Sequence, residues 1–352
     1  MPQPPNNKKP PLTGPPSAPL SASPEAGRGR RDFWLGLAGW LLLAAVLTTL
    51  FINRQPLSDW WRLRGYQPPA AVQQLAVQDT MTDYAKHLFY LNRPRLVSSV
   101  ESFRQGCPNS RDNIVLGCYH PNQEGIYIYD VKDSDLQGIA QVTAAHETLH
   151  AAYERLSDKD RQYVNGLLKD YYAHGLTDQR VQDEIKLYQK TEPDAVVDEM
   201  HSTFGTEVAD LPPALQNYYK RYFTNRAAVV AFEKKYEQAF LSRQQVVQAA
   251  DERLAVMRAE IDARRARLES QQEQLQASKS RLDSLLAAGQ NEAYNASLSS
   301  YNAQVSAYNS GVAALRSYIE EYNRLVAERN KVAEQLNVLN QAVDTRQLPS
   351  AE

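Results

Sequence analysis

Residues 33–52 carry no charge and read FWLGLAGWLLLAAVLTTLFI, the most apolar stretch of the chain. A helix rises about 1.5 Å per residue, so these twenty residues span about 30 Å, the thickness of the hydrocarbon core of a bilayer. A cleaved signal peptide has a shorter apolar region that ends in small residues, whereas this run ends in Leu50, Phe51 and Ile52. The pattern therefore predicts an uncleaved transmembrane helix.

Apolar residues recur every seven positions in the last third of the chain. The first series is Val247, Leu254, Ile261, Leu268, Leu275 and Leu282, and the second is Tyr294, Tyr301, Tyr308, Leu315 and Tyr322. A sustained seven-residue period is typical of a coiled coil, whose helices share one apolar seam. Because Gly289 lies between the two series, residues 236–343 are predicted to form an antiparallel coiled-coil hairpin about 75 Å long.

Two short runs in the middle of the chain have the composition of strands. Residues 113–119 and 125–130 are rich in β-branched and aromatic side chains and are bounded by turn-forming residues. The second run alternates isoleucine with tyrosine, as expected for a strand with one face against a core. With helical stretches around them, these runs predict an α+β fold that is mainly α and has a small sheet.

The helical pattern of residues 142–152 carries the most informative side chains. His146 and His150 are four residues apart, so on a helix both imidazoles lie on one face and can hold one Zn²⁺ ion. Glu147 is then placed to act on a metal-bound water. The alternative is an amphipathic helix whose histidines face water, but the rest of this stretch is uncharged and rich in alanine. Burying such polar groups without partners is costly, and this favours the metal site.

A catalytic zinc site needs a third protein ligand and an open position for water. Tyr153 and Leu156 stand where a metzincin has a glycine and a third histidine, so that class is excluded. The candidates that remain are carboxylates farther along the chain. Glu199 is the preferred third ligand, and Asp170 is the alternative.

Residues 146–150 read HETLH and so match the HExxH motif. At Glu199 the chain resembles the gluzincin metallopeptidases, whose third ligand is a Glu on a helix after the HExxH helix. Asp198-Glu199-x-x-Ser202 is similar to their Asn-Glu-x-x-Ser signature, with Asp in place of Asn. The gap between the two motifs is longer than in thermolysin-like members, and Asp170 stands near the shorter distance. Residues 157–193 would then be an insertion of helices between the two ligand helices.

The resemblance implies a zincin-like catalytic domain over residues 69–235 and hydrolysis of peptide bonds, as an endopeptidase rather than an exopeptidase. Zn²⁺ on His146, His150 and Glu199 would lower the pKa of a bound water. Glu147 would take a proton from that water and pass it to the leaving amine.

The resemblance also implies a substrate-binding edge strand just before the zinc helix. That role is assigned to Ile126, Tyr127 and Ile128, and a core strand without substrate contact is the alternative. His174 and His201 are spare imidazoles. Each is a candidate for stabilising the transition-state oxyanion, with an ordinary structural or surface role as the alternative.

Cations on either side of the apolar run predict its orientation. The preceding residues include Lys8, Lys9, Arg28, Arg30 and Arg31, whereas the following ones include Arg54, Arg62 and Arg64. The excess on the first side favours a cytoplasmic N-terminus, with the remaining chain outside the cell membrane. In an oxidising compartment Cys107 and Cys118 can form a disulfide worth about 3 kcal/mol, whereas in the cytoplasm they would be free thiols.

The chain has 352 residues, a net charge of −2 and interspersed charges of both signs, which argues against nucleic-acid binding. The Pro-rich tail 1–32 and the end 344–352 are predicted to be disordered, and 53–68 to be a juxtamembrane linker. The leading interpretation is a membrane-anchored zinc metallopeptidase for protein, peptide or cell-wall peptide substrates. The alternative is an envelope scaffold that acts through its coiled coil, by pairing with a partner or with itself, and has an inactive zincin-like domain.

Overall fold

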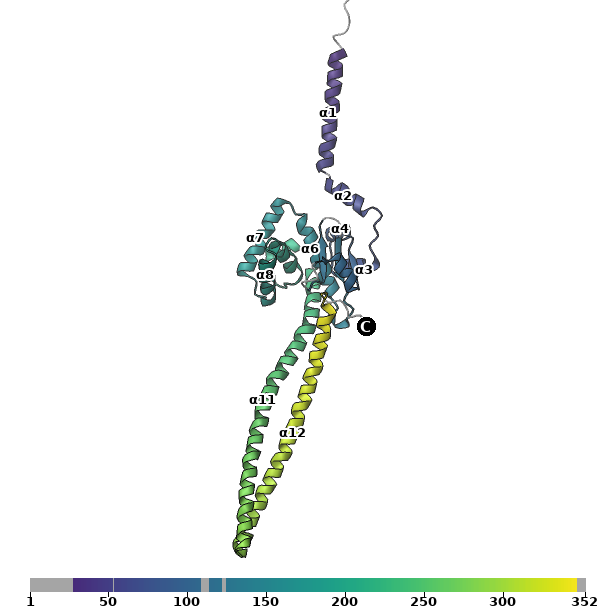
Figure 1. Ribbon diagram of the computed structural model, residues 1–352. Coiled ribbons are helices and arrows are strands. Elements are labelled where there is room, and N and C mark those ends of the chain that lie inside the picture. Colours follow the sequence, from purple (N-terminus) through teal and green to yellow (C-terminus); the bar gives the residue numbers. More distant parts are fainter. Residues whose placement is uncertain (1–27, 53, 109–113, 122–124, 347–352) are drawn as a thin grey trace, which may run out of the picture. The chain divides into compact units, whose positions relative to one another are not determined.

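The computed structural model describes residues 28–52, 54–108, 114–121 and 125–346. These residues are mainly helical and include one three-stranded sheet, in agreement with the predicted fold class (Figure 1). The chain divides into two units, residues 1–64 and residues 65–352. Of the two tails predicted to be disordered, residues 1–27 and 347–352 lie outside the described residues, whereas residues 28–32 are helical and Thr345 is buried.

The first unit contains the apolar run. Helix α1, Arg28–Ile52, includes the stretch Phe33–Leu50, whose mean hydropathy is 1.9 and whose side chains are all exposed. By length and composition, α1 is the one helix in the described part of the chain that is able to cross a membrane. Helix α2, Arg54–Leu63, lies within the predicted linker and exposes Trp60 and Trp61.

The second unit begins with a set of shorter helices around one central helix. They are α3 (Ala70–Gln78), α4 (Asp83–Leu91), α5 (Val100–Gly106), α6 (Ile139–Glu154), α7 (Asp158–His174), α8 (Gln179–Thr191), α9 (Val196–Thr206) and α10 (Pro213–Tyr219), with the 3₁₀ turn η2 (Ser134–Leu136) before α6. The side chains of Thr82, Ser157 and Asp178 accept hydrogen bonds from first-turn amides and so cap α4, α7 and α8. Helix α6 is the central one, because it packs on α3, α4, α9 and the sheet and buries most of its residues.

The sheet consists of β1 (Arg95–Val97), β2 (Gly117–His120) and β3 (Gly125–Tyr129), in the order β1-β3-β2. Strand β3 pairs with β1 in parallel and with β2 in antiparallel fashion.

The prediction that Ile126, Tyr127 and Ile128 form an exposed edge strand is wrong. They belong to β3, the central strand, whose backbone pairs on both sides and whose side chains at these positions are buried. A strand with neighbours on both sides has no free backbone groups for a peptide. The strand that lies at the edge beside α6 is β2.

Two long helices complete the second unit. Helix α11, Arg226–Ala287, and helix α12, Asn291–Val343, lie side by side in antiparallel order (Figure 1). The turn between them contains Gly289, whose φ of 72° is in the left-handed region that favours glycine. Residues of both predicted heptad series are buried or half-buried. We call this pair of helices the hairpin arm.

The hairpin arm starts inside the domain rather than at the predicted boundary of residue 236. Helix α11 begins ten residues earlier, and Val229, Val230 and Glu233 in its first turns are buried. At the other end of the arm, Leu339 on α12 packs against residues near the start of α6. Both helices of the arm are therefore fastened to the domain.

Candidate metal centre

Three side chains predicted to bind a metal converge between α6 and α9. The Nε2 atoms of His146 and His150 lie 3.1 Å apart. The Oε1 atom of Glu199 is 3.3 Å from Nε2 of His146, and its Oε2 atom is 3.5 Å from Nε2 of His150. The sequence therefore identified a set of potential ligands whose donor atoms point at one another.

Close packing of α6 on α9 brings these groups together. Ala144, Ala145, Ala151 and Ala152 on α6 are fully buried, and their small side chains let neighbouring elements approach. On α9 the approach is equally tight, because a Cβ atom at Gly205 would stand 2.3 Å from the side chain of Leu149. The alanine-rich flanks of the HExxH motif thus have a packing role as well as a high helix propensity.

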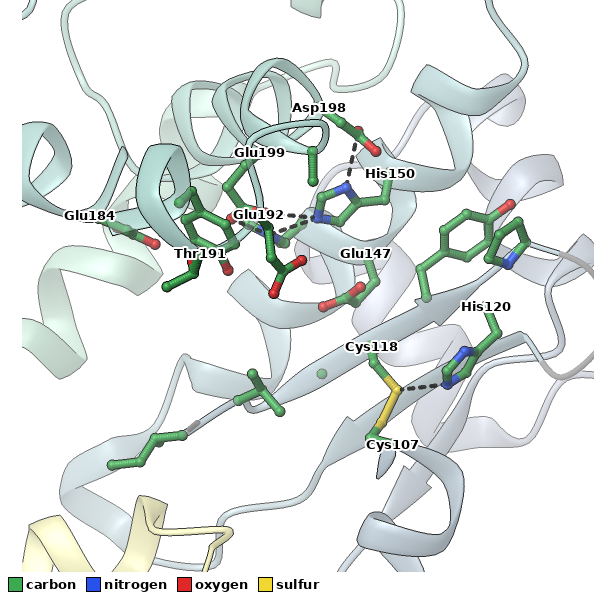
Figure 2. A pocket seen from close by; sticks show the side chains of 18 of the residues that line it. Cys107, Cys118, His120, Glu147, His150, Glu184, Thr191, Glu192, Asp198 and Glu199 are labelled. Carbon is green, nitrogen blue, oxygen red and sulfur yellow. Dashed lines mark hydrogen bonds and ion pairs between the residues drawn. A yellow bond between two sulfur atoms is a disulfide. The ribbon is translucent and has the colours of Figure 1, made fainter. Parts of the chain in front are cut away.

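Two more carboxylates lie behind the histidines. Oδ1 of Asp198 is 3.0 Å from Nδ1 of His150, as the dashed line in Figure 2 marks. Oε1 of Glu207 is 4.0 Å from Nδ1 of His146. A carboxylate within hydrogen-bond distance of Nδ1, as Asp198 is, orients the ring and leaves Nε2 free to face a metal, whereas Glu207 is beyond that distance and acts on His146 through its charge. The sequence pattern includes Asp198 only as a signature residue, and no local signal reveals the position of Glu207.

The pKa values of His146 and Glu199 are strongly shifted in the absence of a metal. Burial opposes a charge on His146, but the carboxylate of Glu199 outweighs burial and raises the pKa of His146 to about 10. Burial also raises the pKa of Glu199, but the two histidines outweigh it and lower that pKa to about 2. The carboxylate of Glu199 thus favours positive charge on the imidazole side of the site.

A cavity of about 750 Å³ opens beside the three groups and is lined by α6, α8, α9 and β2. Glu147 lines it, and burial raises the pKa of this carboxyl. Figure 2 shows Glu147 on the cavity side, between Glu199 and the disulfide. At Gly117 of β2, an added Cβ atom would stand 2.7 Å from the carboxylate of Glu147. Glycine at this position therefore lets the edge strand approach the HExxH helix.

The alternative ligand Asp170 lies elsewhere. It is on α7 with its side chain 79% exposed, and its Oδ1 atom is 3.1 Å from Nδ1 of His174. Neither residue lines the cavity. Of the two carboxylates that the sequence offered, only Glu199 approaches the two histidines.

The two candidates for oxyanion stabilisation also lie outside the cavity lining. His174 is exposed, and His201 is fully buried on α9, where its Nε2 atom is 2.9 Å from the hydroxyl of Tyr218. His201 is packed among tyrosine rings. Tyr188 of α8 does line the cavity, and burial raises the pKa of its phenol. No pattern in the sequence distinguishes it from the other tyrosines.

Cys107 and Cys118 are joined by a disulfide, with their Cα atoms 6.0 Å apart. The bond fastens the end of α5 to β2 at the cavity wall. The Nε2 atom of His120 lies 3.3 Å from Sγ of Cys118 and 2.7 Å from the carbonyl oxygen of Gly106. These contacts hold the edge strand beside the three converging groups.

Comparisons with protein-family models, with curated proteins and with solved structures find no match to this chain. The chemistry of the site is therefore inferred from its residues and their geometry.

Stability of the metal-free protein is expected to fall as the pH rises from 6.5 towards 10. The pKa of His146 is raised from 6.5 to about 10, so its stabilising contribution is complete below 6.5 and is lost as the pH rises through about 10. Glu199, whose pKa is lowered from 4.5 to about 2, contributes fully above 4.5 and loses its effect only in acid.

Zinc binds the neutral imidazole, so a zinc ion held by these histidines should abolish this loss. Melting temperatures measured with chelator and with zinc across this pH range test the expectation. An equal decline in both forms would contradict it.

Proposed function

We propose that this chain is a membrane-anchored, zinc-dependent hydrolase of peptide bonds. The observation that carries the proposal is the convergence of His146, His150 and Glu199 beside the buried carboxyl of Glu147. Four ligands about 2.05 Å from a tetrahedral zinc ion stand about 3.3 Å apart. The three separations of 3.1, 3.3 and 3.5 Å between the donor atoms fit this geometry.

The composition of the donor set supports zinc in particular. Two imidazoles and one carboxylate are a common protein ligand set for catalytic zinc, and a fourth position is left for water. When bound, zinc supplies a Lewis acid that lowers the pKa of a water and polarises a carbonyl group. The contact from Asp198 to His150 supports the same assignment, since ligating histidines usually have such a partner.

Glu147 is the general base of the proposed reaction. It lies next to one ligand in sequence, lines the cavity, and is not one of the three converging groups. Its carboxylate takes a proton from the attacking water and delivers it to the leaving amine. Burial raises the pKa of Glu147, which strengthens it as a base.

Tyr188 takes the place of His174 and His201 as the proposed oxyanion donor. A tyrosine phenol is protonated at neutral pH, and Tyr188 lines the cavity, so it can donate a hydrogen bond there.

The substrate peptide is proposed to bind along β2. In the described part of the chain this strand pairs only with β3, and all four of its residues line the cavity. An extended peptide can add to such a free strand edge through main-chain hydrogen bonds. Binding of this kind suits an endopeptidase, because the peptide can continue on both sides of the cleaved bond.

Helix α1 is proposed to anchor the enzyme with its N-terminus in the cytoplasm, and the hairpin arm to be a coiled coil. The excess of cations before the apolar run and the disulfide between Cys107 and Cys118 support an extracytoplasmic catalytic domain. A protease added to intact cells should therefore cleave the domain. If the domain is cleaved only after the membrane is broken, the orientation is the opposite one.

The proposal is tested by measuring bound zinc and hydrolysis of a mixed peptide library with the purified chain. We expect one zinc ion per chain, internal cleavage of peptides, and loss of cleavage on chelation. Zinc without turnover would favour the alternative function, a scaffold that acts through the hairpin arm. Turnover that survives complete removal of metal would contradict the proposed chemistry.

A further inference from the structure

Arg180 on α8 lies among carboxylates from three separate elements. Its guanidinium is 2.8 Å from Glu207, which follows α9, and 3.0 Å and 3.1 Å from Glu233 and Glu237 on α11. Glu184, one turn along α8, is 3.4 Å away. A planar guanidinium with five N–H donors can bind several carboxylates at once, which a lysine ammonium does with less fixed geometry.

Glu207 connects this cluster to the proposed metal centre. Its Oε2 atom faces Arg180, whereas its Oε1 atom is 4.0 Å from Nδ1 of His146. The side chain of Glu207 is only 10% exposed. The position of the carboxylate behind His146 therefore depends on the position of Arg180.

The position of Arg180 depends in turn on the hairpin arm. Glu233 is 2% exposed and has the guanidinium of Arg180 as its ion-pair partner. A buried carboxyl, whether ionised or protonated, is costly to leave without its hydrogen-bond partner, so Glu233 and Arg180 stay in contact while the start of α11 is packed in the domain. Val229 and Val230 in the preceding turn are buried in the domain and hold the start of α11 in place.

The other helix of the hairpin arm ends at the same cavity. After α12, the hydroxyl of Thr345 donates to the carbonyl oxygen of Val115, two residues before β2. Arg346 follows and lines the cavity. The start of α11 thus contacts Arg180 of α8, and the end of α12 leads to a contact with the segment before β2.

We propose that Arg180 is a positioning residue that couples the seating of the hairpin arm to the metal centre. Through Arg180, helix α11 holds Glu207 behind His146 and so sets the affinity of the site for zinc. A ligand or second protein that shifts the base of α11 changes zinc affinity by the same coupling. This inference rests on the proposed zinc site.

The test compares substitutions at this cluster with a matched one. Arg243 on α11 also joins the arm to the domain, through Asp135 of η2, but it has no contact with the metal-binding groups among the contacts of the described residues. Arg180→Gln should weaken zinc binding by about threefold to tenfold, at or below the lower end of the effect of removing a direct partner of a ligating histidine, because Arg180 acts through Glu207, which lies 4.0 Å from His146. Arg243→Gln should leave zinc affinity within about twofold of the original value.

A second variant alters a residue of α11 and leaves Arg180, Glu184 and Glu207 unchanged. Glu237 is 29% exposed, so Glu237→Lys places a cation beside Arg180 without burying it deeply. It should lower zinc affinity by roughly threefold or more, because Arg180 is displaced from Glu207. Arg180→Lys, which keeps the charge but loses the planar fork, should lie between Arg180→Gln and the original chain.

Zinc affinity is measured by competition with a chromophoric chelator, and Co²⁺ absorption spectra report the ligand geometry. Melting temperatures of the metal-free variants separate a loss of fold from a loss of ligand support. Equal zinc affinity in Arg180→Gln, Glu237→Lys and Arg243→Gln overturns this inference and leaves the proposed function standing. If the original chain binds no zinc, both the proposed function and this inference fail.

Discussion

Replacing Glu147 by Gln is expected to abolish peptide hydrolysis while zinc remains bound. The amide has nearly the shape of the carboxylate but cannot accept the proton of the attacking water, so the rate should fall by a factor of about 10² to 10⁴. The three converging donor atoms do not include Glu147, so the metal content should not change. Zinc per chain and the rate of peptide cleavage are measured on the same sample.

The matched control is Glu192→Gln. Glu192 is another carboxylate that lines the cavity, but it is not one of the three converging groups. Its replacement should leave cleavage within a few-fold, on the order expected for a residue outside the proton transfer. Full turnover in Glu147→Gln would remove this residue from the mechanism.

Replacing His150 by Ala is expected to remove zinc from the protein. The change deletes one of the two converging imidazoles, and it also leaves the carboxylates of Asp198 and Glu199 without that partner. Zinc affinity should fall by roughly 100-fold or more, beyond the range found for residues that only support a ligand. Equilibrium dialysis against a zinc buffer measures the loss.

His174→Ala and Asp170→Ala are the controls, because these two side chains pair with each other on the exposed face of α7. Both variants should keep their zinc. Glu199→Gln should lose zinc as His150→Ala does. If Asp170→Ala loses the metal and Glu199→Gln retains it, the third ligand has been assigned to the wrong carboxylate.

The spacing of His146 and His150 made their convergence predictable, since residues four apart on a helix lie on one face. The approach of Glu199 was harder to predict, because helices α7 and α8 lie between the two motifs in sequence. The sequence favours Glu199 over Asp170 only through the match at Ser202 and the apolar helical residues around it. The contact of Asp198 with His150 depends on how α9 is rotated against α6, and a single sequence contains no measure of that rotation.

The order of the strands could not be read from the chain. Strand β1 has only three residues, too few for an alternating pattern, yet its parallel pairing moves β3 from the edge to the centre of the sheet. The start of α11 is unpredictable from the heptad pattern for a related reason. Its first turns bury Val229 and Val230 against the domain. The apolar positions in these turns are therefore set by packing in the domain core and do not show the seven-residue period of the hairpin arm.

The continuity of α11 has a geometric consequence. It is one helix of 62 residues, about 90 Å long, with one end packed in the domain core and the other at the Gly289 turn. A tilt of about 3° at the core end would carry the far end through about 5 Å over that length. Conversely, a displacement of about 5 Å at the Gly289 turn would rotate the core end of α11 by only about 3°.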